Sequence, residues 1–323
     1  MENGRMRALV TGGAGFIGSH LVHHLVERGD EVVVLDDLST GEASAVHPGA
    51  VLMAGDVCDP AGVRSAIDGC DVVFHLAAHR AIARSIDDPA GTDRTNSQGT
   101  VTVLTAAAEA GIPRVVNASS SSVYGEPAST PVREDDPKLP MSPYAVSKLA
   151  AEHYCRVFGD LFGLHTISLR YFNVYGPGQP SDGRYATVIP LFLDALLSGR
   201  RPVIFGDGSR ARDFTYVEDV VRATVAAAAA PVEAAGCAYN LAAGRPFSLV
   251  RLLELLGELV GVEPDAVHED ARPGDVLRTH GDPAALERDI GYRCEVPLEE
   301  GLARTVEWFR ARRRDPAVGP RVP

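Results

Sequence analysis

The feature that most restricts the fold of this chain is a glycine cluster near its N-terminus, in Thr11-Gly-Gly-Ala-Gly-Phe-Ile-Gly-Ser-His20. Gly13, Gly15 and Gly18 match the pattern G-x-G-x-x-G, and Gly12, Gly15 and Gly18 match the variant G-x-x-G-x-x-G. Glycines so spaced permit a tight turn, close approach of a pyrophosphate and close packing of a helix on a strand. A short apolar run precedes them and a helical pattern follows. The segment therefore predicts a strand–turn–helix unit whose helix N-terminus binds a dinucleotide.

An acidic residue stands at the distance that such a unit requires. Asp36 ends the next predicted strand, 18 residues after Gly18. A carboxylate there accepts a hydrogen bond from the adenosine ribose of NAD. The segment 35–41 contains no arginine that could bind the 2′-phosphate of NADP, and the carboxylate would repel that phosphate. The pattern predicts NAD in preference to NADP.

The first half of the chain alternates apolar runs with helical patterns, which predicts an α/β fold with a doubly wound parallel (Rossmann) sheet. We expect strands at 7–11, 31–36, 50–54, 71–76, 114–118 and 165–170, and helices at 16–28, 61–68, 92–110 and 143–160. After Arg170 the rhythm changes, with helical patterns at 187–198, 217–230, 248–260 and 298–313. We expect an NAD-binding domain from 1–175 and 214–245, and a smaller α/β substrate-binding domain from 176–213 and 246–323.

The charge and the cysteine content of the chain limit the kinds of molecule that it is expected to bind. The net charge of −12 argues against nucleic acid or an anionic membrane surface as the main partner. No apolar run is long enough to span a bilayer. The five cysteines are scattered and have no C-x-x-C spacing, which favours reduced thiols in a cytoplasmic protein. His20, His23 and His24 lack a neighbouring carboxylate at a metal-ligand spacing, so no metal site is predicted.

A second candidate for chemistry is Ser142-Pro-Tyr-Ala-Val-Ser-Lys148. Pro143 suits the start of a helix, and Tyr144 and Lys148 then share a face because they are four residues apart. A nearby ammonium favours a phenolate, so we expect Lys148 to lower the pKa of Tyr144 toward the range of a general base. Taken alone, the spacing Y-x-x-x-K is common. Serine hydroxyls that follow the strand at 114–118 should reach the same crevice.

Five motifs in this order resemble a known family: TGGAGFIG, HLAA, SSSSVYG, SPYAVSK and LRYFNVYGPGQ. The chain is similar to extended short-chain dehydrogenases/reductases, in the nucleotide-sugar epimerase/dehydratase branch close to UDP-hexose 4-epimerases. The resemblance covers nearly the whole chain. It implies bound NAD, a nucleotide-sugar substrate and a homodimer formed through the helices at 92–110 and 143–160.

The resemblance also implies roles for individual residues. The catalytic residues would be Ser120, Tyr144 and Lys148. Cofactor contacts would come from Gly12, Gly15, Phe16, Ile17, Gly18, Asp36, Asp37, Ser39, Asp56, Val57, Leu76, Ala77, Ala78, Asn96, Ser119, Tyr144, Lys148 and Tyr171. Substrate contacts would come from Arg84, Ser120, Ser122, Tyr144, Asn173, Val188, Val203, Phe205, Arg212, Arg272, Asp275 and Thr279.

One position separates the reactions of that branch. Its dehydratases and decarboxylases usually carry a glutamate two residues before the tyrosine of V-Y-G, whereas this chain has Ser122 there and Ser121 before it. Without a second acid–base group, the resemblance favours inversion at C4 of an NDP-hexose over elimination. The small Thr279 is compatible with a 2-acetamido or otherwise enlarged sugar. A dehydratase or decarboxylase, or a non-catalytic NAD-binding protein, remains the alternative.

The chain departs from the family pattern after HLAA, where His79 and Arg80 replace the more usual Gln-Ala. Together with Arg84, they add positive charge beside the expected sugar pocket. This charge is consistent with a modified sugar or with a loop that packs on phosphate, and both interpretations stay open.

Overall fold

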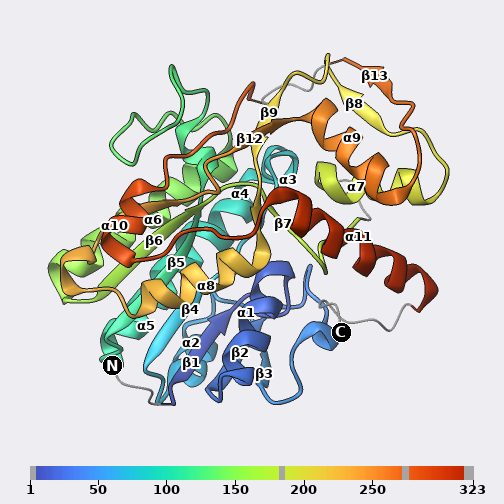
Figure 1. Cartoon of the computed structure of the whole chain (residues 1–323). Coiled ribbons are helices and arrows are strands. Elements are labelled where there is room, and N and C mark those ends of the chain that lie inside the picture. Colours follow the sequence, from blue (N-terminus) through green and yellow to red (C-terminus); the bar gives the residue numbers. More distant parts are fainter. Residues whose placement is uncertain (1–4, 182–185, 271–275, 316–323) are drawn as a thin grey trace.

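The computed structural model describes residues 5–181, 186–270 and 276–315. Its centre is a seven-stranded parallel sheet with the strand order β11-β6-β5-β4-β1-β2-β3 (Figure 1). The strands are β1 (Arg7–Thr11), β2 (Glu31–Asp36), β3 (Val51–Ala54), β4 (Val72–His75), β5 (Arg114–Ser120), β6 (His165–Tyr171) and β11 (Ala238–Leu241). The predicted doubly wound α/β fold is confirmed.

Helices cover both faces of the sheet, which explains the continuous apolar runs in its strands. Because side chains alternate along a strand, Val10 packs with α1 (Phe16–Glu27) and α8 (Val217–Ala228), while Leu9 packs on the opposite face. That opposite face carries α2 (Pro60–Ile67), α5 (Gly99–Glu109) and α6 (Pro143–Phe162).

The helix expected at 92–110 is not continuous α-helix. It consists of α4 (Pro89–Asp93), a π-helical turn at Arg94–Gln98 and α5. Such π turns occur mostly as single turns within α-helices, often at functional sites. This one contains the buried Asn96, whose side chain is directed at the loop that follows β4.

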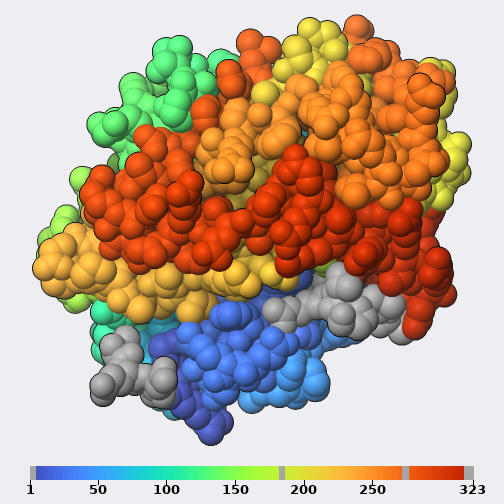
Figure 2. All heavy atoms as spheres, in the orientation of Figure 1, coloured from blue at the N-terminus to red at the C-terminus, as the bar shows by residue number. Residues whose placement is uncertain are grey.

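The second half of the chain builds a smaller unit beside the carboxyl ends of the sheet strands, at the upper right of Figure 1. It contains β8 (Val203–Phe205) paired with β13 (Val267–Glu269), and β9 (Ala211–Asp213) paired with β12 (Pro246–Ser248). Its helices are α7 (Val188–Leu197), α9 (Leu249–Val260) and α11 (Leu298–Arg314). They enclose an apolar cluster of their own that includes Phe192, Leu252 and Trp308. In Figure 2 the orange and red C-terminal part forms a continuous band above the blue N-terminal part.

Several short elements carry no clear pattern in the sequence. They are α3 (Ile82–Asp87), α10 (Ala284–Ile290), β11 and the short pair β7 (Val174–Tyr175) and β10 (Thr215–Tyr216). Periodicity needs longer segments to be recognisable. Within the described ranges, none of the helices combines the length and the apolar character that a bilayer crossing demands.

Candidate functional site

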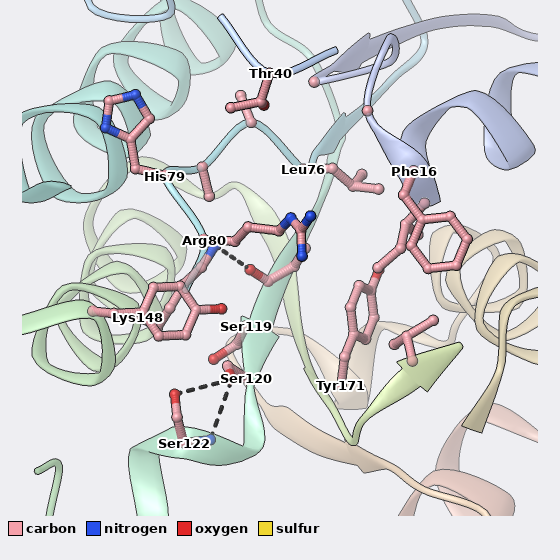
Figure 3. A pocket seen from close by; sticks show the side chains of 18 of the residues that line it. Phe16, Thr40, Leu76, His79, Arg80, Ser119, Ser120, Ser122, Lys148 and Tyr171 are labelled. Carbon is pink, nitrogen blue, oxygen red and sulfur yellow. Dashed lines mark hydrogen bonds between the residues drawn. The ribbon is translucent and has the colours of Figure 1, made fainter. Parts of the chain in front are cut away.

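A pocket lies at the carboxyl ends of the sheet strands, where the smaller unit faces the sheet (Figure 3). This is the edge at which ligands bind in open α/β sheets. Most of the residues singled out in the sequence line it: Gly12, Gly15, Phe16, Ile17, Gly18, Asp36, Asp37, Ser39, Val57, Leu76, Ala77, Ala78, Ser119, Ser120, Ser122, Tyr144, Lys148, Tyr171, Asn173, Arg212 and Thr279. Segments far apart in the chain thus converge on one crevice.

The glycine turn between β1 and α1 has no room for side chains at two positions. Gly12 has φ +71°, and a Cβ there would lie 2.7 Å from the backbone nitrogen of Ala77. A Cβ on Gly18 would lie 2.0 Å from the carbonyl oxygen of Gly12. These contacts hold the N-terminus of α1 close to β1 and β4. The exposed backbone and the helix N-terminus fit the diphosphate of a dinucleotide.

Asp36 is held in a defined orientation at the end of β2. Its Oδ2 accepts a hydrogen bond from the backbone N–H of Ala14 at 2.9 Å, and its Oδ1 accepts one from Leu38 at 2.9 Å. The carboxylate is buried yet lines the pocket. A fixed acceptor beside the glycine turn fits the ribose of NAD, so the residues present suit this cofactor.

Helix α6 carries the tyrosine and the lysine into the pocket from the other side. It begins with Pro143, and the N-cap Ser142 accepts a hydrogen bond from the N–H of Ala145 at 3.1 Å. One turn separates Tyr144 from Lys148. The ammonium of Lys148 is buried and donates to the carbonyl oxygen of Ala118 in β5 at 2.8 Å. Burial lowers the pKa of Lys148 to about 8.

The expected lowering of the Tyr144 pKa was wrong for the protein without ligands. Burial raises the pKa of Tyr144, while a hydrogen bond from Ser120 and the charge of Arg80 oppose that rise. The physical reason is desolvation, because the phenolate loses more hydration than the neutral phenol does in this site. Arg80 keeps its charge throughout the pH range in which a phenol titrates.

Ser120 is oriented by its neighbour Ser122. The Oγ of Ser120 accepts from the backbone N–H of Ser122 at 3.2 Å and from the hydroxyl of Ser122 at 2.9 Å (Figure 3). A hydroxyl has two acceptor lone pairs and one proton. With both lone pairs occupied, Ser120 has only its proton left to offer. This arrangement makes Ser120 a donor toward the Tyr144 oxygen or a bound ligand.

A buried polar network supports the end of β5 from behind. The hydroxyl of Ser119 donates to Oε1 of Glu152 at 2.5 Å. The carboxylate of Glu152 also accepts from Nε and Nη2 of Arg170, at 2.9 and 2.8 Å. Nη1 of Arg170 donates to the Tyr124 hydroxyl at 2.6 Å, and that hydroxyl donates to Asn240 of β11 at 2.6 Å. The network connects α6, β5, β6 and β11, and so positions the strand that bears Ser119 and Ser120.

The side of the pocket formed by the smaller unit contains three of the expected substrate residues. Nδ2 of Asn173 donates to the Thr279 hydroxyl at 2.7 Å and to the carbonyl of Asp213 at 3.0 Å. Nη2 of the buried Arg212 donates to the carbonyl of Val276 at 2.8 Å. Arg272 and Asp275, the other expected contacts in this region, lie outside the described residues.

Six expected contacts are absent from the pocket lining within the described chain: Asp56, Arg84, Asn96, Val188, Val203 and Phe205. Asp56 binds the backbone N–H of Cys58 at 2.8 Å and Nη2 of Arg94 at 3.1 Å. Asn96 lies behind the loop that follows β4. Arg84 donates to Nε2 of His79 at 3.1 Å. Val188 begins α7, and Val203 and Phe205 lie in β8.

Other lining residues were not assigned a role from the sequence. They include Thr40, Ile82, Gln179 and Thr187, together with His79 and Arg80. Gln179 is 4% exposed, and its Oε1 has no hydrogen-bond partner in the described structure. The sequence signal that could have identified Gln179 is its position in the glycine- and proline-rich segment that follows Tyr175. In the described ranges, no group of histidine, cysteine, aspartate or glutamate side chains could hold a metal ion.

Comparison with known proteins agrees with this geometry. Residues 8–242 match the model of the NAD dependent epimerase/dehydratase family. The UDP-glucose 4-epimerase of Mycolicibacterium smegmatis is 40% identical over 313 residues, which cover 94% of this chain and 99% of that protein. The crystal structure of a Thermotoga maritima UDP-glucose 4-epimerase with UDP-glucose is 36% identical and superimposes with a TM-score of 0.92, over 95% of this chain and 99% of its own. A dTDP-glucose 4,6-dehydratase of Streptomyces griseus is 35% identical over 316 residues, 94% of each chain.

Proposed function

The chain belongs to the NAD dependent epimerase/dehydratase family, and from this membership we propose that it is a nucleotide-sugar 4-epimerase. It would invert C4 of an NDP-hexose, of the UDP-glucose/galactose or N-acetylhexosamine type, through a transient 4-keto sugar. The observation that supports this most is the meeting of Ser120, Tyr144 and Lys148 in one pocket with the glycine turn.

The chain's own groups supply binding, orientation and proton transfer. Bound NAD supplies reversible acceptance of a hydride from the sugar carbon. Tyr144 removes the proton of the 4-hydroxyl and later returns it. Ser120, whose lone pairs are occupied by Ser122, donates a hydrogen bond to the reacting oxygen. Lys148, which donates to the carbonyl oxygen of Ala118 in β5, would hold a ribose of the cofactor.

The immediate surroundings of Tyr144 favour epimerisation over elimination. Ser121 and Ser122 occupy the positions at which a dehydratase carries acids, and both line the pocket. Among the described lining residues, the only carboxylates are Asp36 and Asp37, which belong to the glycine-turn end. Elimination needs a second acid–base group besides Tyr144. The described residues offer none near it.

The reaction class can be tested with the purified protein and no added NAD. We expect new stereoisomers by NMR when the protein is incubated with a panel of UDP-, ADP-, GDP- and dTDP-sugars. Epimerisation leaves the product mass unchanged, whereas loss of water or CO2 does not. A product of lower mass would establish the dehydratase or decarboxylase alternative. NAD binding without conversion of any sugar would establish a non-catalytic protein.

We further propose that two copies associate through α5 and α6. Val146, Tyr154, Val157 and Leu161 recur along α6 at helical spacing and are 52, 42, 40 and 72% exposed. An apolar stripe of this kind on a polar helix fits the same stripe of a second copy across a two-fold axis.

Light scattering should therefore give the mass of a dimer at micromolar concentration. Val157→Glu, which places two like charges at the interface, should shift the protein to monomers. Val262→Glu, an exposed valine of the smaller unit, should not. A monomeric wild-type protein would exclude this dimer.

A further inference from the structure

A buried aspartate, Asp213, lies behind the wall that the smaller unit contributes to the pocket. It ends β9 and is 0% exposed. Its Oδ2 accepts hydrogen bonds from the backbone N–H groups of Gly244 and Gly281, both at 3.1 Å, and its Oδ1 accepts one from Arg245 at 3.4 Å. Within the described residues, the partners of this carboxylate are backbone N–H groups and no cation. Burying a charge without a counter-charge is costly, so we looked for what these bonds hold in place.

The backbone of Asp213 contacts two side chains that line the pocket. Its carbonyl oxygen accepts from Nδ2 of Asn173 at 3.0 Å, and its N–H donates to Oγ1 of Thr279 at 3.2 Å. A carbonyl oxygen can only accept and a backbone N–H can only donate. These two bonds therefore decide which end of the Asn173 amide is turned toward Asp213 and which role the Thr279 hydroxyl takes there.

A third hydrogen bond completes the arrangement, from Nδ2 of Asn173 to Oγ1 of Thr279 at 2.7 Å. It uses the second hydrogen of the Asn173 amide nitrogen and the second lone pair of the Thr279 hydroxyl. Within the described chain, what the pair has left for a ligand is Oδ1 of Asn173 and the hydroxyl proton of Thr279. The wall therefore presents one acceptor and one donor whose roles are fixed from behind.

We propose that Asp213 is a positioning residue for the nucleotide sugar: its carboxylate fastens β9 to the segments 243–245 and 279–281, and its backbone sets Asn173 as an acceptor and Thr279 as a donor toward the substrate. The proposal rests on the proposed epimerase function and adds to it a residue that does not itself line the pocket. Asp213 acts only through the side chains that it holds.

The hydrogen bonds of the Asp213 carboxylate require its ionised form. Protonation turns one oxygen into a donor, which then faces a backbone N–H instead of accepting from it. Burial raises the pKa of Asp213 to about 6, although the surrounding backbone N–H groups act to lower it. The arrangement is therefore intact above this pH and is lost as the pH falls through it, so binding of the nucleotide sugar should weaken in that direction.

Four other ionisable groups share the region around Asp213: Arg212, Arg245, His280 and Cys294. The two arginines keep their charge at every relevant pH. Burial raises the pKa of Cys294, which stays a neutral thiol over this range. Burial lowers the pKa of His280, which brings its titration close to that of Asp213. The experiment must therefore separate Asp213 from His280.

The test measures kcat and KM of Asp213→Asn on the nucleotide sugar that the panel identifies. At neutral pH we expect KM to rise about 10- to 100-fold, the range of hydrogen bonds to a charged group, with kcat and NAD content nearly unchanged. In the wild type, KM should rise about tenfold between about pH 7.5 and about pH 5, and Asp213→Asn should lack this rise. Asp207→Asn is the matched control, because Asp207 is an exposed aspartate of the same unit that binds only within its own turn.

His280→Gln distinguishes the two titrating groups, and the rise of KM at low pH should persist in it. Loss of that rise in His280→Gln would assign the titration to His280 and overturn the proposal. A fall in kcat at unchanged KM in Asp213→Asn, or loss of its NAD, would also contradict it.

A binding measurement covers the cases in which Asp213→Asn does not fold or no sugar is converted. Absence of conversion would refute the epimerase function, whereas calorimetric binding of UDP-glucose to the NAD-loaded wild type needs no turnover. We expect weaker binding at about pH 5 than at about pH 7.5. Equal affinity at the two pH values, or no binding at either, would overturn the role of Asp213.

Discussion

Tyr144→Phe is expected to lower kcat by about 10³-fold, or about 4 kcal/mol in the activation free energy, because it removes the group that accepts the sugar proton. Only the phenolic oxygen is lost. The ring still fills its half-buried site, and Lys148 keeps its bond to Ala118. We therefore expect the variant to purify with the same NAD content as the wild type and to unfold at the same temperature.

The measurement is initial-rate kinetics on whichever nucleotide sugar the panel identifies, with NAD quantified in each preparation. Tyr239→Phe is the matched control, because Tyr239 lies in β11 and does not line the pocket. Full activity in Tyr144→Phe would remove Tyr144 from the mechanism. Loss of both NAD and activity would show a binding role instead of an acid–base role.

Glu152→Gln is expected to destabilise the protein by about 3 kcal/mol, because it leaves a buried guanidinium without its counter-charge. The side chains of Arg170 and Glu152 are 5 and 6% exposed and pair at 2.8 Å. Ser119 loses its charged acceptor in the same variant. The network joins four elements of the sheet domain, so the loss should affect global unfolding and not one terminus.

Denaturant unfolding followed by circular dichroism measures this effect. The control is Glu254→Gln, which breaks the Arg251–Glu254 pair on α9, where both side chains are about half exposed. That change should cost less than about 1 kcal/mol, as surface ion pairs do. Equal midpoints for the two variants would show that the Glu152–Arg170 pair contributes no more than a solvent-exposed one.

Local patterns predicted six of the seven strands of the sheet and several residues that line the pocket. The strands β1 and β2 occupy their predicted residues, and α1 and α6 begin at their predicted first residues, Phe16 and Pro143. Apolar runs and helix-cap residues involve only a few neighbouring positions, so they can be recognised in the sequence alone. The glycine turn, Asp36 and the Tyr144/Lys148 spacing belong to this class.

Contacts between segments that are distant in the chain could not be predicted from the sequence. β11 pairs with β6 across 70 residues, and its short run has no strong pattern. Arg170 looked like any strand residue, yet it forms the buried pair with Glu152. Val203 and Phe205 were expected at the substrate, but β8 places them outside the lining. Each of these outcomes depends on which surfaces pack together.

By itself, the sequence determined the fold class, the preference for NAD and the identity of the residues that meet around Tyr144. Those properties follow from backbone sterics, side-chain periodicity and donor chemistry at fixed spacing. The tertiary structure alone decided the direction of the Tyr144 pKa, the donor role of Ser120 and the inward position of Arg80. Burial and hydrogen-bond partners set these properties, and both arise only once the loops, α6 and the smaller unit surround the same space.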